Sequence, residues 1–156
     1  MDLFQFLIND QRTIRARLDA MRGTTYRATR TRMALLRDAK ELLEALAEFE
    51  QGVLYPLLKH NRSLHALLQE CQRDHKQIKQ VLKKWIAVPP NDDEWEQHFH
   101  TLDGVFRSLA SRERTKLFPR ARKLLSPEQL EDMGMRAQET RNELEQAKLR
   151  VKLSEE

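Results

Sequence analysis

One eleven-residue pattern occurs twice in this chain and constrains its fold more than any other feature. The copies span residues 46–56 and 109–119, so the second begins 63 positions after the first. The matching positions are Leu46/Leu109, Glu50/Glu113, the aromatic pair Tyr55/Phe118, and Pro56/Pro119. A weaker match precedes each copy, residues 9–15 against 73–79. The repeat indicates two related helical hairpins that face each other.

Apolar residues at steps of three and four predict the helices, and Gly, Pro and Asn/Asp clusters separate them. The predicted helices cover about 3–23, 28–58, 63–86, 92–125 and from about 126 onward. The last begins at Ser126 with a capping box and a proline in its first turn. Helices of this length joined by short turns favour an all-α, antiparallel up-down four-helix bundle with an additional C-terminal helix. We expect the end of that helix to fray.

Composition limits the class of protein. Four glycines and five prolines among 156 residues favour helix throughout, and residues 1–156 are expected to form a single domain. Cys71 is the only cysteine, so no internal disulfide can form. No apolar run approaches the roughly 18 residues of a membrane span. We therefore expect a cytoplasmic protein without a membrane partner.

Charge is unevenly distributed along the chain. Residues 1–40 hold nine Lys/Arg and four Asp/Glu, whereas residues 126–156 hold five and eight. The early arginines follow helical spacing without a set of stacking aromatics, which disfavours a nucleic-acid partner and favours a solvated helix face. The sequence contains no glycine-rich phosphate loop and no nucleophile elbow, which excludes nucleotide-binding and hydrolase motifs.

Over about residues 2–140 the chain resembles the hemerythrin-like (HHE) cation-binding family. The repeating unit of that family is an Asp/Glu-His pair on one helix, then H-x-x-x-E and a Tyr/Phe-Pro on the next. Residues 74–75, the two repeat copies and the stretch 117–130 carry the resemblance. It implies a bundle that surrounds two iron ions with imidazole and carboxylate ligands, for oxygen binding, sensing or iron handling.

The resemblance also implies which ligand positions this chain has changed. Histidines of the family are replaced here at Gln11, Leu46 and Leu109, while His75, Glu50 and Glu113 remain. Leucines would fill the pocket with ordinary core packing, so we expect the di-iron site to be lost. The retained residues could form a vestigial polar cluster with Gln11 or a reaching arginine, Arg12 or Arg112. Alternatively, they could hold one metal ion.

These observations predict a non-enzymatic, hemerythrin-like binding or regulatory module. We expect no resident cofactor, and an unidentified protein or a second copy of the chain as partner. The alternative is a metal-binding protein for oxygen, nitric oxide or iron sensing, or for iron handling. Its ion would be iron, in a mononuclear or di-iron site, so metal content separates the two hypotheses.

Overall fold

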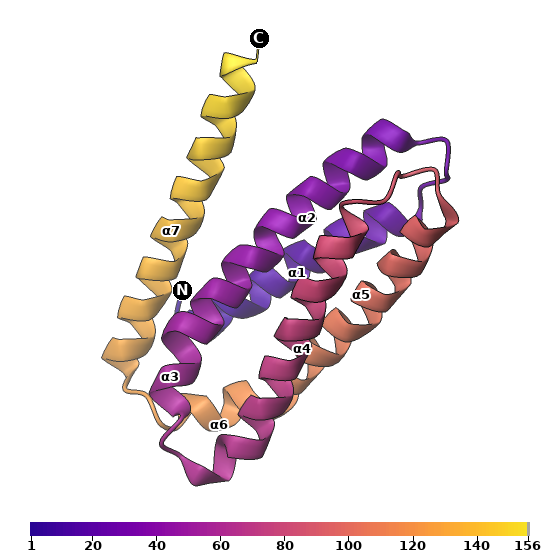
Figure 1. The fold of residues 1–156 in the computed structure, drawn as a ribbon. Helices are drawn as coiled ribbons and strands as arrows, with labels where there is room; N and C mark the ends of the chain where they lie inside the picture. Colours follow the sequence, from indigo (N-terminus) through magenta and orange to yellow (C-terminus); the bar gives the residue numbers. More distant parts are fainter. Residues whose placement is uncertain (156) are drawn as a thin grey trace.

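The fold is a four-helix bundle extended by one further helix (Figure 1). The computed structural model describes residues 1–155, and every regular element within them is helical; Glu156, the last residue of the predicted domain, lies outside this range. The bundle helices are α1 (Leu3–Arg22), α2 (Thr29–Phe49), α4 (His65–Trp85) and α5 (Asp93–Arg112). The predicted all-α bundle with an added C-terminal helix is therefore confirmed.

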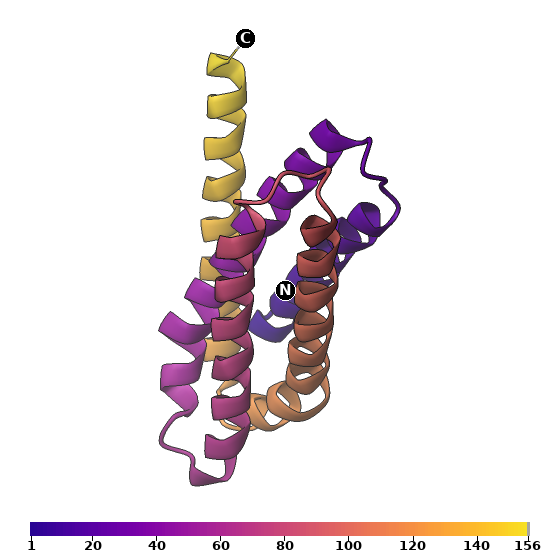
Figure 2. The same ribbon diagram turned by 45° about the vertical axis from the view of Figure 1, so that its right-hand side comes forward.

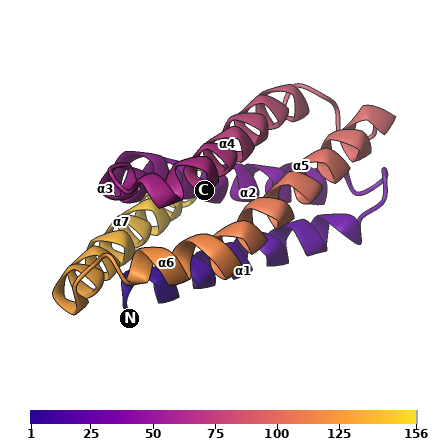
Figure 3. The same ribbon diagram turned by 90° about the horizontal axis from the view of Figure 1, so that it is seen from below.

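Two hairpins make up the bundle, as the repeat predicts. α1 packs on α2, and α4 packs on α5. Figures 2 and 3 show these helices from two further directions. Short segments complete the chain: η1 (Glu50–Leu54), α3 (Tyr55–Leu58), η2 (Arg62–Leu64), η3 (Glu113–Leu117) and α6 (Phe118–Arg122). None of the helices described is long and apolar enough to cross a membrane.

One end of the bundle is closed by aromatic side chains. Trp85 and Trp95 meet edge to face with ring centroids 5.2 Å apart, and both are buried. The guanidinium group of Arg32 lies 4.3 Å from the centroid of the Trp95 ring and donates to the carbonyl groups of Thr24 and Pro90. Because Thr24 and Pro90 belong to the two interhelical loops, Arg32 joins both loops to the core.

The last helix, α7 (Pro127–Ser154), lies against α1. The predicted capping box is present: the Ser126 side chain accepts from the Gln129 amide, and the Gln129 side chain accepts from the Ser126 amide. Midway along α7, Arg141 forms a buried ion pair with Asp10 of α1. Beyond it, Lys148 of α7 pairs with Asp38 and Glu41 of α2. Fraying of the end of α7 stays a prediction.

Gly134 allows the start of α1 to approach α7 closely. A Cβ atom added at Gly134 would lie 2.5 Å from the Met1 carbonyl oxygen and 2.8 Å from the Asp2 carbonyl carbon. Gly134→Ala is expected to lower the free energy of unfolding by about 1–3 kcal/mol, as overpacking does. Urea denaturation measures this. The matched control is Gly104→Ala in exposed helix, where nothing lies within 4 Å; equal effects would contradict the account.

Candidate metal site

Three polar side chains meet in the middle of the bundle: Glu50, His75 and Glu113. Glu50 and Glu113 are 0% exposed and His75 is 5% exposed. One potential ligand atom from each lies within 4.8 Å of the other two. They come from the end of α2, from α4 and from the end of α5, so three of the four bundle helices contribute to the site. The structure thus brings together the three residues that the sequence singled out.

A π-helical segment begins at each of the two site glutamates: η1 at Glu50, after α2, and η3 at Glu113, after α5. The amide of Tyr55 donates to the Glu50 carbonyl, and the amide of Phe118 donates to the Glu113 carbonyl, each five residues earlier. The next residue in each copy is proline, which has no amide to continue the ordinary four-residue pattern. The sequence predicted uninterrupted helices over 28–58 and 92–125. The five-residue segments η1 and η3 correct this prediction, and such π segments are frequent at functional sites.

Tyr55 is the site residue that the sequence did not reveal. Its hydroxyl oxygen lies 2.8 Å from Glu50 Oε2, 2.8 Å from Glu113 Oε2 and 3.0 Å from His75 Nε2. The corresponding residue of the second copy is Phe118, which packs against Phe4 with ring centroids 4.9 Å apart. The sequence held one signal, since the repeat has tyrosine in one copy only and a buried hydroxyl needs a polar partner.

Gln11 also belongs to the cluster, because its side-chain amide donates to Glu113 Oε1 at 3.1 Å. The two arginines considered as partners lie elsewhere. Arg12 is exposed on α1, and Arg112 pairs with Glu70 and Asp74. Within residues 1–155, no Lys or Arg forms an ion pair with Glu50 or Glu113. Two carboxyl groups are thus buried without a Lys or Arg partner among the described residues, and His75 is the basic side chain beside them.

Burial controls the ionisation of the cluster. It raises the pKa of Glu50, and it raises that of Glu113 well above the ordinary value, where the neighbouring Glu50 carboxyl adds to the effect. Burial lowers the pKa of His75, which favours the neutral imidazole. Glu50 Oε1 is buried without a hydrogen-bond partner among the described residues. The site must therefore take up either protons or a cation to offset its negative charge.

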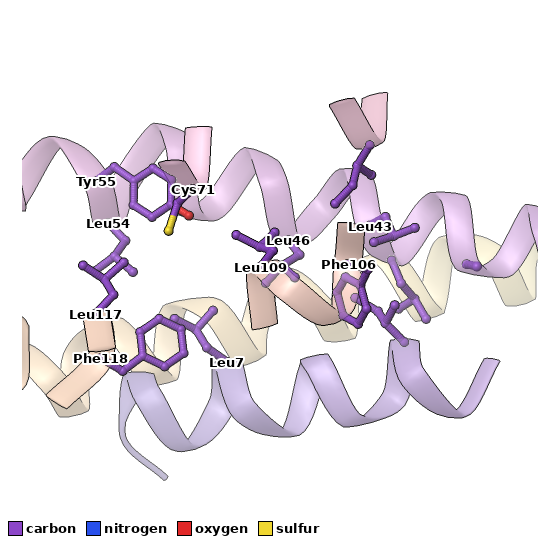
Figure 4. Close-up of a cluster of buried hydrophobic side chains, with 14 of the residues drawn as sticks. Leu7, Leu43, Leu46, Leu54, Tyr55, Cys71, Phe106, Leu109, Leu117 and Phe118 are labelled. Atoms are coloured by element: carbon purple, nitrogen blue, oxygen red, sulfur yellow. The ribbon is translucent and has the colours of Figure 1, made fainter. Parts of the chain in front are cut away.

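Leu46 and Leu109 lie beside this cluster, one turn before Glu50 and Glu113. Each is 1% exposed, and Figure 4 shows their side chains meeting between the helices. Branched hydrocarbon from both copies therefore fills the space on that side of the carboxyl groups. Neither side chain has an atom that can ligate a metal ion.

The side chains at the site bear on how many metal ions it could hold, two or one. Leu46, Leu109 and Gln11 stand where the resemblance places three imidazole ligands of a two-iron site. One ion does fit, since two carboxylates and an imidazole are a donor set found for iron and zinc. The unpartnered Glu50 Oε1 offers a further lone pair.

Comparison with known proteins identifies a family. The family model described as the hemerythrin HHE cation binding domain matches residues 2–121. This range covers α1 to α5, α6 apart from its last residue Arg122, and all the residues of the cluster, and it leaves α7 outside. No curated protein and no solved structure matches the chain.

Proposed function

We propose that this chain, which belongs to the hemerythrin HHE cation-binding family, has lost the paired-iron site and keeps a site for one metal ion. Glu50, His75 and Glu113 would hold the ion, and iron is the ion that the family favours. The observation that carries the proposal is the burial of these three side chains within 4.8 Å of one another, with no Lys or Arg among the described residues paired to either glutamate. Buried carboxylates need such a counter-charge.

A bound ion would supply that positive charge, and iron would add a change of oxidation state as a signal. The other residues favour holding the ion over catalysis. Leu46 and Leu109 keep hydrocarbon beside the cluster, which restricts water and substrate. Gln11 fixes Glu113 through its side-chain amide. We therefore propose a non-enzymatic protein that senses or handles a metal ion.

The position of Gln11 supports a sensing role. Its neighbour in the chain is Asp10, whose carboxylate forms the buried ion pair with Arg141 of α7. A change in the position of Glu113 would alter its hydrogen bond with Gln11. Through the neighbouring residue Asp10, it would also alter the ion pair with Arg141 that holds α7. α7 lies outside the matched family region. We therefore propose that a regulatory response changes how α7 packs against the bundle.

The second candidate function is a metal-free binding or regulatory module. The Tyr55 hydroxyl favours this candidate, because it lies within hydrogen-bond distance of both carboxyl groups, 2.8 Å from each. Hydrogen bonds and bound protons could then satisfy the cluster without a metal ion. The partner would be an unidentified protein or a second copy of the chain. The exposed apolar side chains Leu149, Val151 and Leu153 on α7 offer a surface for it.

Thermal unfolding of chelator-treated protein separates the two candidates. An ion at about 100 times its Kd stabilises the native state by about 2.7 kcal/mol, which is a Tm rise of about 5–10 °C for a chain of this size. We expect this rise with Fe²⁺ under anaerobic conditions in the wild type and not in His75→Ala. The control is His60→Ala, which removes an exposed histidine. No rise in the wild type with either Fe²⁺ or Fe³⁺, or an equal rise in His75→Ala, contradicts the single-ion proposal.

A further inference from the structure

We infer that Tyr55 is a fourth ligand of the proposed site, and that the ion which this donor set selects is ferric iron. The inference rests on the proposed single-ion function and adds a donor to the histidine and the two glutamates named there. Glu50, His75 and Glu113 contribute two carboxylate oxygens and one imidazole nitrogen. Tyr55 adds a phenol oxygen and makes the set three oxygens and one nitrogen.

The distances within the cluster match those between neighbouring ligands on one ion. The Tyr55 hydroxyl oxygen lies 2.8, 2.8 and 3.0 Å from the nearest ligand atoms of Glu50, Glu113 and His75. His75 Nε2 and Glu50 Oε2 are 3.3 Å apart. Ligand atoms at about 2.1 Å from a shared ion stand roughly 3 Å from one another. The hydroxyl therefore has the spacing of a coordinating atom relative to all three partners.

The ion that balances the site depends on how Tyr55 binds, because a divalent ion balances two glutamates and a neutral phenol, whereas Fe³⁺ balances two glutamates and a tyrosinate. Two glutamates and a tyrosinate carry three negative charges, and Fe³⁺ carries three positive charges, so the filled site would be neutral. Neutrality matters because Tyr55 is 2% exposed, both glutamates are fully buried, and an uncompensated charge is costly in such surroundings. Anionic oxygen donors are also the ligands that hard cations prefer.

Ligand exchange alone accounts for the binding step. The O–H bond of the phenol breaks, its proton leaves to solvent, and an Fe–O bond forms; any carboxyl proton leaves in the same way. The iron arrives as Fe³⁺ and stays Fe³⁺, so no electron is transferred.

The asymmetry of the repeat restricts this donor to one side of the bundle. Phe118 occupies the equivalent position after the second π segment, where it has no hydroxyl and packs on Phe4. Since the same backbone arrangement carries phenylalanine there, Tyr55→Phe is expected to fold. It removes one oxygen atom and leaves the other three donors in place.

The test is the absorption spectrum of the protein loaded with Fe³⁺ from its nitrilotriacetate complex. Coordination by tyrosinate produces a visible phenolate-to-iron charge-transfer band. The chain has two tyrosines, Tyr26 and Tyr55, and Tyr26 is 55% exposed. We expect the band in the wild type and in Tyr26→Phe, and its loss in Tyr55→Phe. Circular dichroism checks the fold of each variant.

A resonance Raman spectrum of Tyr26→Phe tests the same point without altering the site, because Tyr55 is then the sole tyrosine. Enhanced tyrosinate ring vibrations support the inference. Iron bound without the band, or a band that persists in Tyr55→Phe, overturns the role of Tyr55 and leaves the single-ion function standing. If the wild type binds neither Fe³⁺ nor Fe²⁺, the proposed function fails and the inference fails with it.

Discussion

Glu113→Gln is expected to abolish metal binding and, at the same time, to stabilise the metal-free protein at neutral pH. Glutamine keeps the size and the hydrogen-bonding shape of the side chain, but it cannot carry the charge that an ion requires. Even outer partners of a metal ligand change affinity by about 10–100-fold, so loss of the ligand itself should exceed about 100-fold. Calorimetric titration of both proteins with Fe²⁺ measures this difference.

The gain in stability follows from the raised pKa of the Glu113 carboxyl group. Between the ordinary value of 4.5 and the raised native value, the native state binds more protons than the unfolded state does. The free energy of unfolding therefore falls as pH rises through this window. Glutamine has no such proton, so the variant should be more stable by about 1–3 kcal/mol above the window, the usual cost of a poorly satisfied buried polar group.

Urea denaturation of chelator-treated protein from pH 5 to pH 8 measures the pH dependence. The lowered pKa of His75 acts in the opposite sense, since the unfolded state takes up the proton as pH falls below 6.5. The difference between Glu113→Gln and the wild type at each pH removes most of that contribution. Glu48→Gln, at an exposed position of α2, is the matched control. A variant that keeps its metal, or is less stable across the whole range, contradicts this interpretation.

Restoring histidine at Gln11, Leu46 and Leu109 is expected to make folding depend on metal and to create a second ion site. In the metal-free triple variant, two buried leucines become imidazoles without designed partners. The free energy of unfolding should fall by about 3–5 kcal/mol, the range for large changes in a packed core. Iron should restore the stability, because the new imidazoles then have an ion to bind.

Elemental analysis and urea denaturation, each with and without iron, test this expectation. The control is Leu46→Met/Leu109→Met, which nearly conserves volume. It should cost less than about 1.5 kcal/mol per site and leave the number of bound ions unchanged. A triple variant that is stable without metal, or that binds no second ion, would show that the two leucines do not mark the lost ligand positions.

Much of the fold follows from local sequence signals. Apolar spacing predicts the helices, Ser126 with Gln129 predicts the start of α7, and the repeat predicts two related hairpins. These features depend on residues close together in the chain, and the family match over residues 2–121 agrees with them. The three residues of the cluster could also be predicted, because Glu50 and Glu113 occupy the same place in the two copies and the family resemblance adds His75.

The remaining features depend on contacts between distant residues. Pro56 and Pro119 lack a backbone N–H, and the sequence shows this. The length of each π segment, in contrast, depends on contacts with distant residues around the cluster. The role of Tyr55 requires three helices to bring Glu50, His75 and Glu113 to one hydroxyl group. The position of α7 depends on a close approach at Gly134. No local pattern encodes these distances.

The most direct test of the central claim is the number of metal ions per chain. Elemental mass spectrometry should be applied to untagged protein expressed with added iron, beside His75→Ala prepared in the same way. The account predicts one iron per chain in the wild type and less than about a tenth of that in the variant, in line with loss of a ligand. Two irons per chain with the absorbance of an oxo bridge, or no stoichiometric metal in the wild type, would contradict it.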